Sequence, residues 1–231
     1  MHDEVSIEKK LPNRVDGTLR KFALRVPECI YKCSGIIVFG KRIKSLVFST
    51  DLSIIRNVNA DAVFAVYPFT PQPIITQALL LAADIPVFAG VGGGLTKGQR
   101  VVNLAMFAEM QGATGVVLNA PTANAVVQHV AETIDIPVVV TVARADTDFE
   151  ARLQAGANIF NVSAAAETPA IVRSIRERYP DVPIIATGGP TDESILETIQ
   201  AGANAITWTP PSNGEIFRDI MAAYRDNKPH P

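Results

Sequence analysis

The sequence predicts an α/β protein, a single (β/α)8 TIM barrel over residues 45–231, preceded by an N-terminal extension, residues 1–44, that caps the bottom of the barrel. Three observations predict this fold. Two short motifs repeat in alternation, eight apolar segments have the length of strands, and the segments between them have the apolar spacing of helices. The chain has 231 residues, close to the roughly 250 that such a barrel needs.

The two motifs recur in the order expected of a barrel. Asp-Ile/Val-Pro-Val/Ile opens an apolar segment at Asp84, Asp135 and Asp181. Gly-Ala precedes an apolar segment and is expected to end a helix, with glycine as the C′ residue, at Gly112, Gly156 and Gly202. The repeat therefore contains two strand–helix units. Such a repeat favours a closed ring over an open doubly wound sheet, because every unit of a ring has equivalent neighbours.

The apolar segments are the predicted strands, at residues 45–50, 60–67, 85–90, 114–119, 136–143, 158–163, 182–187 and 204–209. Their nearly continuous apolar composition is typical of parallel strands that are covered on both faces. Between them, segments such as 171–178 place apolar residues three and four apart, with arginines on the opposite face. Strand and helix therefore alternate along the chain.

The N-terminal extension divides into three parts. A charged tail runs to about Arg14, a helix is expected over 18–32, and the apolar segment 35–40 is expected to plug the N-terminal mouth of the barrel. The basic segment 40–44 is interpreted as a solvated turn. Because it leads into the first barrel strand, it lies opposite the usual ligand site.

Composition narrows the choice of partner. The hydrophobic fraction is 48%, and a net charge of −2 offers no basic face for nucleic acid. The N-terminus lacks the pattern of a secretory signal, and no apolar run is long enough to span a bilayer. We therefore expect a cytoplasmic protein whose partner is a small molecule, with homo-oligomerisation left open.

Residues that could bind metal are sparse. Cys29 and Cys33 would share a face of a helix and could supply half a metal site, but no second pair accompanies them, so two reduced thiols are the simpler interpretation. The histidines fall away from the predicted strand ends, at His2, His129 and His230. No metal is expected, and a Schiff-base aldolase is disfavoured because no lysine ends a strand.

In a barrel, the residues at the carboxyl ends of the strands converge on the active site. Asp51 follows the first strand and is either a general base, if burial raises its pKa, or the N-cap of the next helix. Asn119 and Asn161 carry amides that could orient a hydroxyl or stabilise an enolate oxygen. Arg144 could clamp an anionic group, or pair with Asp146 or Asp148.

Two later loops suggest an anion site. Thr187, Gly188 and Gly189 follow the seventh strand, where glycines let backbone amides approach an anion. The second wall, at the start of the last helix, would consist of Ser212, Asn213 and Gly214. The alternative is a structural Gly-Gly turn with a serine N-cap. Lys97, on a glycine-rich loop, is a further candidate ligand contact or simply a solvated lysine.

The phrase from Ala186 to Gly189, followed by the segment from Ala201 to Ile206, resembles the phosphate-binding branch of the aldolase-type barrel superfamily. That resemblance covers about residues 45–225 and implies a phosphate on the amides after strands seven and eight. Here Pro210 and Pro211 replace the usual Gly-Ser and donate no N–H. The chain also resembles a little-characterised group of bacterial barrels with a generic hydrolase label, through the segments 187–193 and 209–215.

We therefore expect a small-molecule enzyme acting on a phosphorylated, oxygen-rich metabolite by cofactor-free proton transfer, of isomerase, epimerase or lyase type. Asp51 would be the base. One alternative is a hydrolase, which would need Asp146 or Asp148 beside Asp51 to activate water. Another is a non-catalytic phosphate-ligand sensor, as in barrels that resemble the glycerol uptake antiterminators. FMN is possible on Gly188 and Gly189 but disfavoured, because no set of residues suits its ring.

Overall fold

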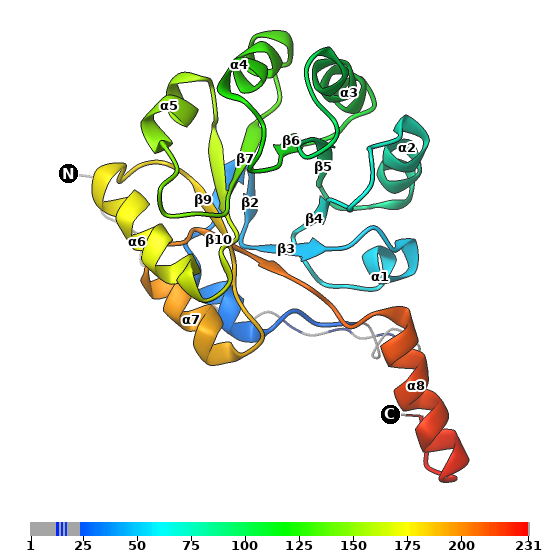
Figure 1. Ribbon diagram of the computed structural model, residues 1–231. Helices are drawn as coiled ribbons and strands as arrows, with labels where there is room; N and C mark the ends of the chain where they lie inside the picture. Colours follow the sequence, from blue (N-terminus) through cyan, green and yellow to red (C-terminus); the bar gives the residue numbers. More distant parts are fainter. Residues whose placement is uncertain (1–12, 14, 16, 18–23, 231) are drawn as a thin grey trace, which may run out of the picture.

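The computed structural model describes residues 13, 15, 17 and 24–230. Eight parallel strands close into a barrel, each hydrogen-bonded to the next along the chain, and the last pairs with the first (Figure 1). Every barrel strand overlaps a predicted segment, with β5 running two residues beyond its own, so the predicted fold class is confirmed. The strands are β3 (Ser45–Phe48), β4 (Ala62–Ala65), β5 (Val87–Gly92), β6 (Gly115–Leu118), β7 (Val138–Val142), β8 (Ile159–Val162), β9 (Ile184–Thr187) and β10 (Ala205–Trp208).

Seven helices surround the barrel in sequence order (Figure 1). They are α1 (Leu52–Arg56), α2 (Pro73–Ala82), α3 (Gln99–Met110), α4 (Asn124–Thr133), α5 (Phe149–Gln154), α6 (Thr168–Arg178) and α7 (Asp192–Gln200), with the short 3-10 helix η3 (Ala165–Glu167) before α6. The last helix, α8 (Asn213–Arg225), projects away from the barrel (Figure 1), although Ile216, near its start, packs against the core.

The Gly-Ala motif ends three helices as predicted. Gly112, Gly156 and Gly202 all have positive φ, at 92°, 98° and 115°. The alanine after each glycine donates its N–H to a carbonyl five residues earlier, as from Ala113 to Ala108 at 3.0 Å. This is the Schellman pattern, which only a residue tolerant of the left-handed region completes without strain.

The residue after the motif has a role that the sequence did not reveal. In two of the three repeats it is asparagine, whose Oδ1 atom accepts the first N–H of the preceding barrel strand. Asn158 accepts from Val138 at 2.8 Å, and Asn204 accepts from Ile184 at 2.9 Å. These bonds satisfy backbone donors where the strands begin, at the bottom of the barrel.

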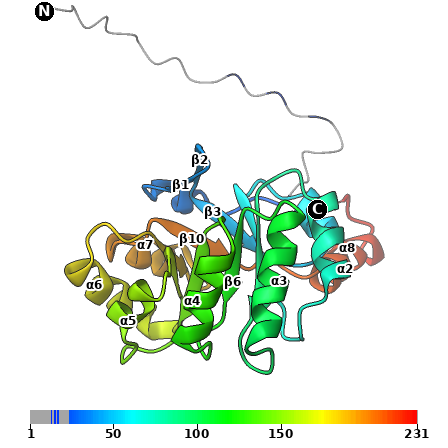
Figure 2. The ribbon, with the colours of Figure 1, turned by 90° about the horizontal axis from the view of Figure 1, so that it is seen from above.

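An antiparallel hairpin, β1 (Ile36–Val38) and β2 (Lys41–Ile43), lies at this end of the barrel (Figure 2). Ile36, Val38 and Ile43 pack into the core cluster that fills the barrel interior. The apolar segment thus plugs the bottom as expected. The solvated turn expected over 40–44 is wrong in part, because 41–43 form a strand that pairs with β1, although Lys41 and Arg42 are exposed.

The helix expected over 18–32 is wrong where the structure describes it. Only Glu28–Lys32 are helical, as the 3-10 helix η2. Pro27 explains the late start, since proline lacks an N–H and disfavours helical geometry in the residue before it. The segment from Leu24 to Gly35 hydrogen-bonds at one end to the loop after α1 and at the other to Asn204, so it lies between α1 and α7 (Figure 1). Residues 18–23 and the tail to Arg14, apart from Asn13, lie outside the described residues.

Cys29 and Cys33 lie in this segment, and both are free thiols buried against the barrel. Burial raises the pKa of Cys33 to about 12. The pKa of Cys29 is also raised, by burial and by the neighbouring carboxylate of Asp192. The two thiols therefore behave as small core side chains.

Candidate functional site

Side chains alternate between the interior and the exterior along each barrel strand. Val117, Val139, Ile159, Ile185 and Ala205 fill the interior, so the residue two positions after each also points inward, at the carboxyl end of its strand. On five consecutive strands, β6 to β10, that residue is polar and uncharged. We call this set the polar arc: Asn119, Thr141, Asn161, Thr187 and Thr207.

Hydrogen bonds link four residues of the polar arc in two pairs. Asn161 donates from Nδ2 to Thr141 Oγ1 at 3.2 Å. Thr207 donates from Oγ1 to the carbonyl of Ala186 at 3.3 Å and lies 3.5 Å from Thr187 Oγ1. These bonds restrain the four side chains, and such preorganisation lowers the cost of binding a ligand.

Asn161 differs from the other residues of the polar arc in its hydrogen bonding. Its side chain is only 5% exposed, yet its buried Oδ1 atom has no hydrogen-bond partner. A buried acceptor without a partner costs on the order of 1–3 kcal/mol, and native proteins retain few of them. The Oδ1 atom therefore marks a place where a donor group of a ligand would be stabilised.

On the other three strands, the inward-pointing position at the carboxyl end has no polar side chain. The corresponding inward positions on β3, β4 and β5 are Phe48, Val66 and Gly90. Phe48 lies with its ring centroid 6.3 Å from that of Phe64, deeper in the barrel. The C-terminal opening of the barrel thus has a polar side and an apolar side.

The expected rise in the pKa of Asp51 is wrong. The carboxylate is the N-cap of α1 and accepts hydrogen bonds from the backbone N–H groups of Ser53, at 2.8 Å, and Ile54, at 3.2 Å. Ser53 Oγ and Asn213 Nδ2 also donate to it. Hydrogen bonds to the charged form, led by that of the Ser53 hydroxyl, lower the pKa of Asp51. The structure thus realises the capping alternative.

Arg144 makes the pairing that we gave as the alternative to a ligand clamp. Its guanidinium donates two hydrogen bonds to Asp146, at 2.8 and 2.6 Å, on the exposed surface. This pairing lowers the pKa of Asp146. Asp148 is also engaged, as the N-cap of α5. The structure does not bring these charged residues into the polar arc.

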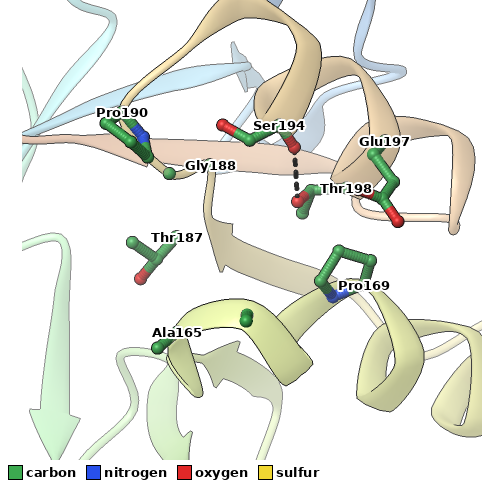
Figure 3. Close-up of a pocket in the computed structure, with 10 residues that line it drawn as sticks. Ala165, Pro169, Thr187, Gly188, Pro190, Ser194, Glu197 and Thr198 are labelled. Atoms are coloured by element: carbon green, nitrogen blue, oxygen red, sulfur yellow. Dashed lines mark hydrogen bonds between the residues drawn. The ribbon is translucent and has the colours of Figure 1, made fainter.

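The loop after β9, residues 187–190, separates two cavities. One, of about 430 Å³, lies between α6 and α7 (Figure 3). Figure 3 shows Gly188 and Thr187 on one side of it, facing Ala165 and Pro169. The other, of about 400 Å³, lies toward β10 and is lined by Thr207, Trp208 and Pro27 of the extension. Thr187 and Gly189 line both cavities.

Gly188 has a packing reason to be glycine. A Cβ atom there would lie 2.7 Å from Ile195 Cγ1 and 2.8 Å from Ile206 Cγ2, both of which are buried. Packing alone therefore explains glycine at position 188, as the alternative of a structural Gly-Gly turn proposed. This does not prevent the backbone amides of the loop from facing the cavities.

The second wall of the expected anion site is already engaged within the protein. Ser212 is the N-cap of α8 and its backbone N–H donates to Glu215 at 2.8 Å, while Asn213 donates to Asp51. The pKa of Glu215 is lowered by its hydrogen bonds with Ser212. Gly214 is exposed in the first turn of α8, and Lys97 is exposed on the loop before α3. In the described part of the chain, no hydrogen bond joins these residues to the loop after β9.

Thr141 and Thr207 are not among the candidate residues selected from the sequence. Thr141 interrupts the apolar run from Val138 to Val142, which is the signal that could have found it. The period of two then selects the inward positions of the neighbouring strands. The alternation of side chains along each strand thus identifies the residues at the C-terminal opening of the barrel better than the last residue of each predicted strand does.

Within the part of the chain that the structure describes, no cluster of three or more histidine, cysteine, aspartate or glutamate side chains could hold a metal ion. In the same residues, no helix has both the length and the apolar character needed to cross a membrane.

No protein-family model and no curated protein matches the chain. Solved structures do match. A phosphoenolpyruvate phosphomutase from Streptomyces platensis subsp. rosaceus is 15% identical, with a TM-score of 0.61 over 86% of each chain. A phosphonopyruvate hydrolase is 13% identical, with a TM-score of 0.61 over 83% of this chain and 85% of the other. The 4-hydroxy-tetrahydrodipicolinate synthase of Methylacidiphilum fumariolicum SolV is 16% identical, with a TM-score of 0.59 over 81% and 75%.

These similarities concern the fold alone, which is a (β/α)8 barrel. A phosphonopyruvate hydrolase was also solved with oxalate and Mg²⁺; it is 12% identical, with a TM-score of 0.59 over 81% and 84%. Mg²⁺ in proteins is held through carboxylates. The polar arc consists of amides and hydroxyls, so this donor set does not fit a magnesium ion.

Proposed function

We propose that this aldolase-type barrel binds a small, oxygen-rich, phosphorylated metabolite at the polar arc and converts it by cofactor-free proton transfer, of isomerase, epimerase or lyase type. The observation that carries the proposal is the unpartnered, buried Oδ1 atom of Asn161 at the ligand end of the barrel. A hydroxyl or amine hydrogen of the ligand would satisfy it.

The chemistry of the arc suits a ligand with several oxygen atoms. Each amide can donate and accept, and each threonine hydroxyl can do either. Asn119 is only partly buried, and its amide could donate to an oxygen that gains negative charge when a proton leaves the ligand. The apolar side, with Phe48, would exclude water from the carbon that reacts.

The phosphate would be held by Thr187 and the amides of Gly188 and Gly189. Thr187 and Gly189 line both cavities, and Gly188 lines the one between α6 and α7. Asp192 lines the cavity toward β10 and would repel a phosphate placed deep in it. The phosphate would therefore lie at the end nearer Thr187 and Thr207. Ser212 and Gly214 play no part in this version of the proposal, because the start of α8 carries its own carboxylate, Glu215.

Asp51 remains the acid–base group that this proposal assigns. Its lowered pKa keeps it ionised at neutral pH, so it can accept a proton, although it is a weak base. Asn213 donates to one of its oxygens, and a ligand would have to displace that amide. Hydrolysis is less well supported, because Asp146 is paired with Arg144 and Asp148 caps α5.

A second candidate function is a non-catalytic sensor of the same ligand. One observation favours it: every side chain of the polar arc is uncharged. Sensor and enzyme share the binding site and differ in whether the ligand changes.

Two measurements test these proposals in order. Ligand-observed NMR with pairs of phosphorylated and dephosphorylated metabolites should detect binding that needs the phosphate and weakens at least tenfold in Asn161→Leu. The bound compounds are then incubated with protein in D2O. Exchange of a carbon-bound proton that is lost in Asp51→Asn supports the enzyme, whereas binding without exchange or conversion supports the sensor. Absence of binding by every phosphorylated compound would refute both.

A further inference from the structure

The last helix, α8, is amphipathic but has no buried residue, unlike the other long helices of the barrel. Its apolar side chains fall on one face, at Ile216, Phe217, Ile220, Met221 and Tyr224. Phe217 is 64% exposed and Tyr224 is 50% exposed. A helix of this length is marginal in water without a packing partner, so the face requires cover.

Among the described residues, the barrel covers only part of this face, at Ile216. The place between α7 and α1, where the eighth helix of the ring would pack, is taken by residues 24–35 of the extension. Val26, Ile30 and Cys33 are buried there. The direction of α8 is set at its first turn, where Asn213 is bound to Asp51 and Ser53 (Figure 1).

The same chain exposes a second apolar surface. It lies on the outer faces of α2 and α3, which are neighbours in the ring (Figure 1). We call it the α2–α3 face, formed by Ile74, Leu81, Met106, Phe107 and Met110. Leu81 is 80% exposed and Met110 is 75% exposed. Single exposed apolar residues are ordinary, but a group on adjacent helices is typical of an interface.

We propose that two copies of this chain form a twofold dimer in which α8 of each copy packs its apolar face on the α2–α3 face of the other. In a twofold dimer this contact occurs twice, so one pair of surfaces covers both apolar regions in both copies. The exposed apolar side chains of the two faces would bury on the order of 1,500 Å² over the dimer, within the range of stable interfaces. Contact between the two α8 helices alone would fall short of that range.

Analytical ultracentrifugation of the full chain at micromolar concentration tests this. The expected mass is twice 24.8 kDa for the unmodified protein. Phe217→Glu, on α8, and Met110→Glu, on the α2–α3 face, should each weaken the dimer at least tenfold. Leu95→Glu, at a residue that is 95% exposed but outside both faces, should leave it unchanged. Circular dichroism identifies any variant that fails to fold.

A pair of opposite charges tests whether α8 of one copy contacts the α2–α3 face of the other. Phe217→Lys combined with Met110→Glu should regain part of the dimer that either substitution alone removes. A monomer at every concentration would overturn the proposal. So would a dimer that resists Phe217→Glu, or one that is sensitive to Phe217→Glu but not to Met110→Glu, since α8 would then pack elsewhere.

Discussion

The two ends of the barrel are built differently. At the bottom, the β1–β2 hairpin fills the interior with Ile36, Val38 and Ile43, and asparagine side chains satisfy the first backbone donors of β7 and β9. At the top, the interior ends in the polar arc, where the Oδ1 atom of Asn161 has no partner. We infer that the bottom of the barrel is organised for stability, whereas the top retains polar groups that folding does not need.

The largest expected effect is at the bottom plug. Ile43→Ala should destabilise the protein by about 2–4 kcal/mol, because Ile43 is buried and its removal leaves a cavity. Equilibrium unfolding in urea measures the change. Ile37→Ala is the control, since Ile37 lies on the same hairpin but is exposed, and it should have almost no effect. Equal losses in the two variants would mean that the hairpin does not plug the barrel.

The second largest effect on stability is expected at Asn204, whose side chain accepts the first backbone N–H of β9. Asn204→Ala leaves the backbone N–H of Ile184 without its acceptor and should cost about 1–3 kcal/mol. Asn204→Asp keeps an oxygen acceptor there and should recover most of the loss. The same unfolding assay compares the pair, and an alanine variant as stable as the unmodified protein would contradict the proposed capping of the strand.

Asp51 should have a smaller effect on stability that depends on pH. Asp51→Ala should cost about 1 kcal/mol at neutral pH through loss of the helix cap, and Asp51→Asn should cost less, because asparagine also caps helices. The pKa of Asp51 is lowered on folding, so the stability due to its charge is present above the unfolded pKa and is lost as pH falls through the folded pKa. The difference between the unmodified protein and Asp51→Asn should therefore shrink in acid. A difference that grows in acid would refute the lowered pKa.

The smallest effect on stability is expected at the polar arc. Asn161→Leu should change the unfolding free energy by less than about 1 kcal/mol in either direction, since it removes an acceptor that has no partner together with the hydrogen bond that Asn161 donates to Thr141. The effect should be clearly smaller than at the bottom plug. A loss comparable to that of Ile43→Ala would show that Asn161 is a structural residue and would remove the contrast between the two ends.

Much of the fold could be predicted because its signals are local. The proline-containing motif and the Gly-Ala motif mark strand starts and helix ends, and the glycines do adopt the left-handed region that a helix end requires. Residues 24–26, before Pro27, were harder, because they were expected to belong to a helix but hydrogen-bond to the loop after α1. Tertiary contacts decided the conformation of this segment, and the sequence carries no local trace of them.

The candidate site could be predicted only in part. Asn119, Asn161 and Thr187 were found because they lie at or near the carboxyl ends of predicted strands, and strand alternation brings them together. The pKa of Asp51 could not be predicted, since its direction depends on whether burial or hydrogen bonding dominates, and Asn213 arrives from the other end of the chain. The departure of α8 from the ring was equally hidden, because an amphipathic helix has the same pattern wherever it packs.

The central claim is that the polar arc binds an oxygen-rich, phosphorylated ligand, and ligand-dependent thermal stability tests it most directly. A ligand present at 100 times its dissociation constant should stabilise the protein by about 2.7 kcal/mol. Thr187→Val with Thr207→Val is a better probe than any change at Gly188, where a Cβ atom would strike the core. The account predicts stabilisation by a phosphorylated compound, none by its dephosphorylated partner, and loss of the effect in that double variant and in Asn161→Leu. Stabilisation of the same size in the unmodified protein and in both variants would contradict it.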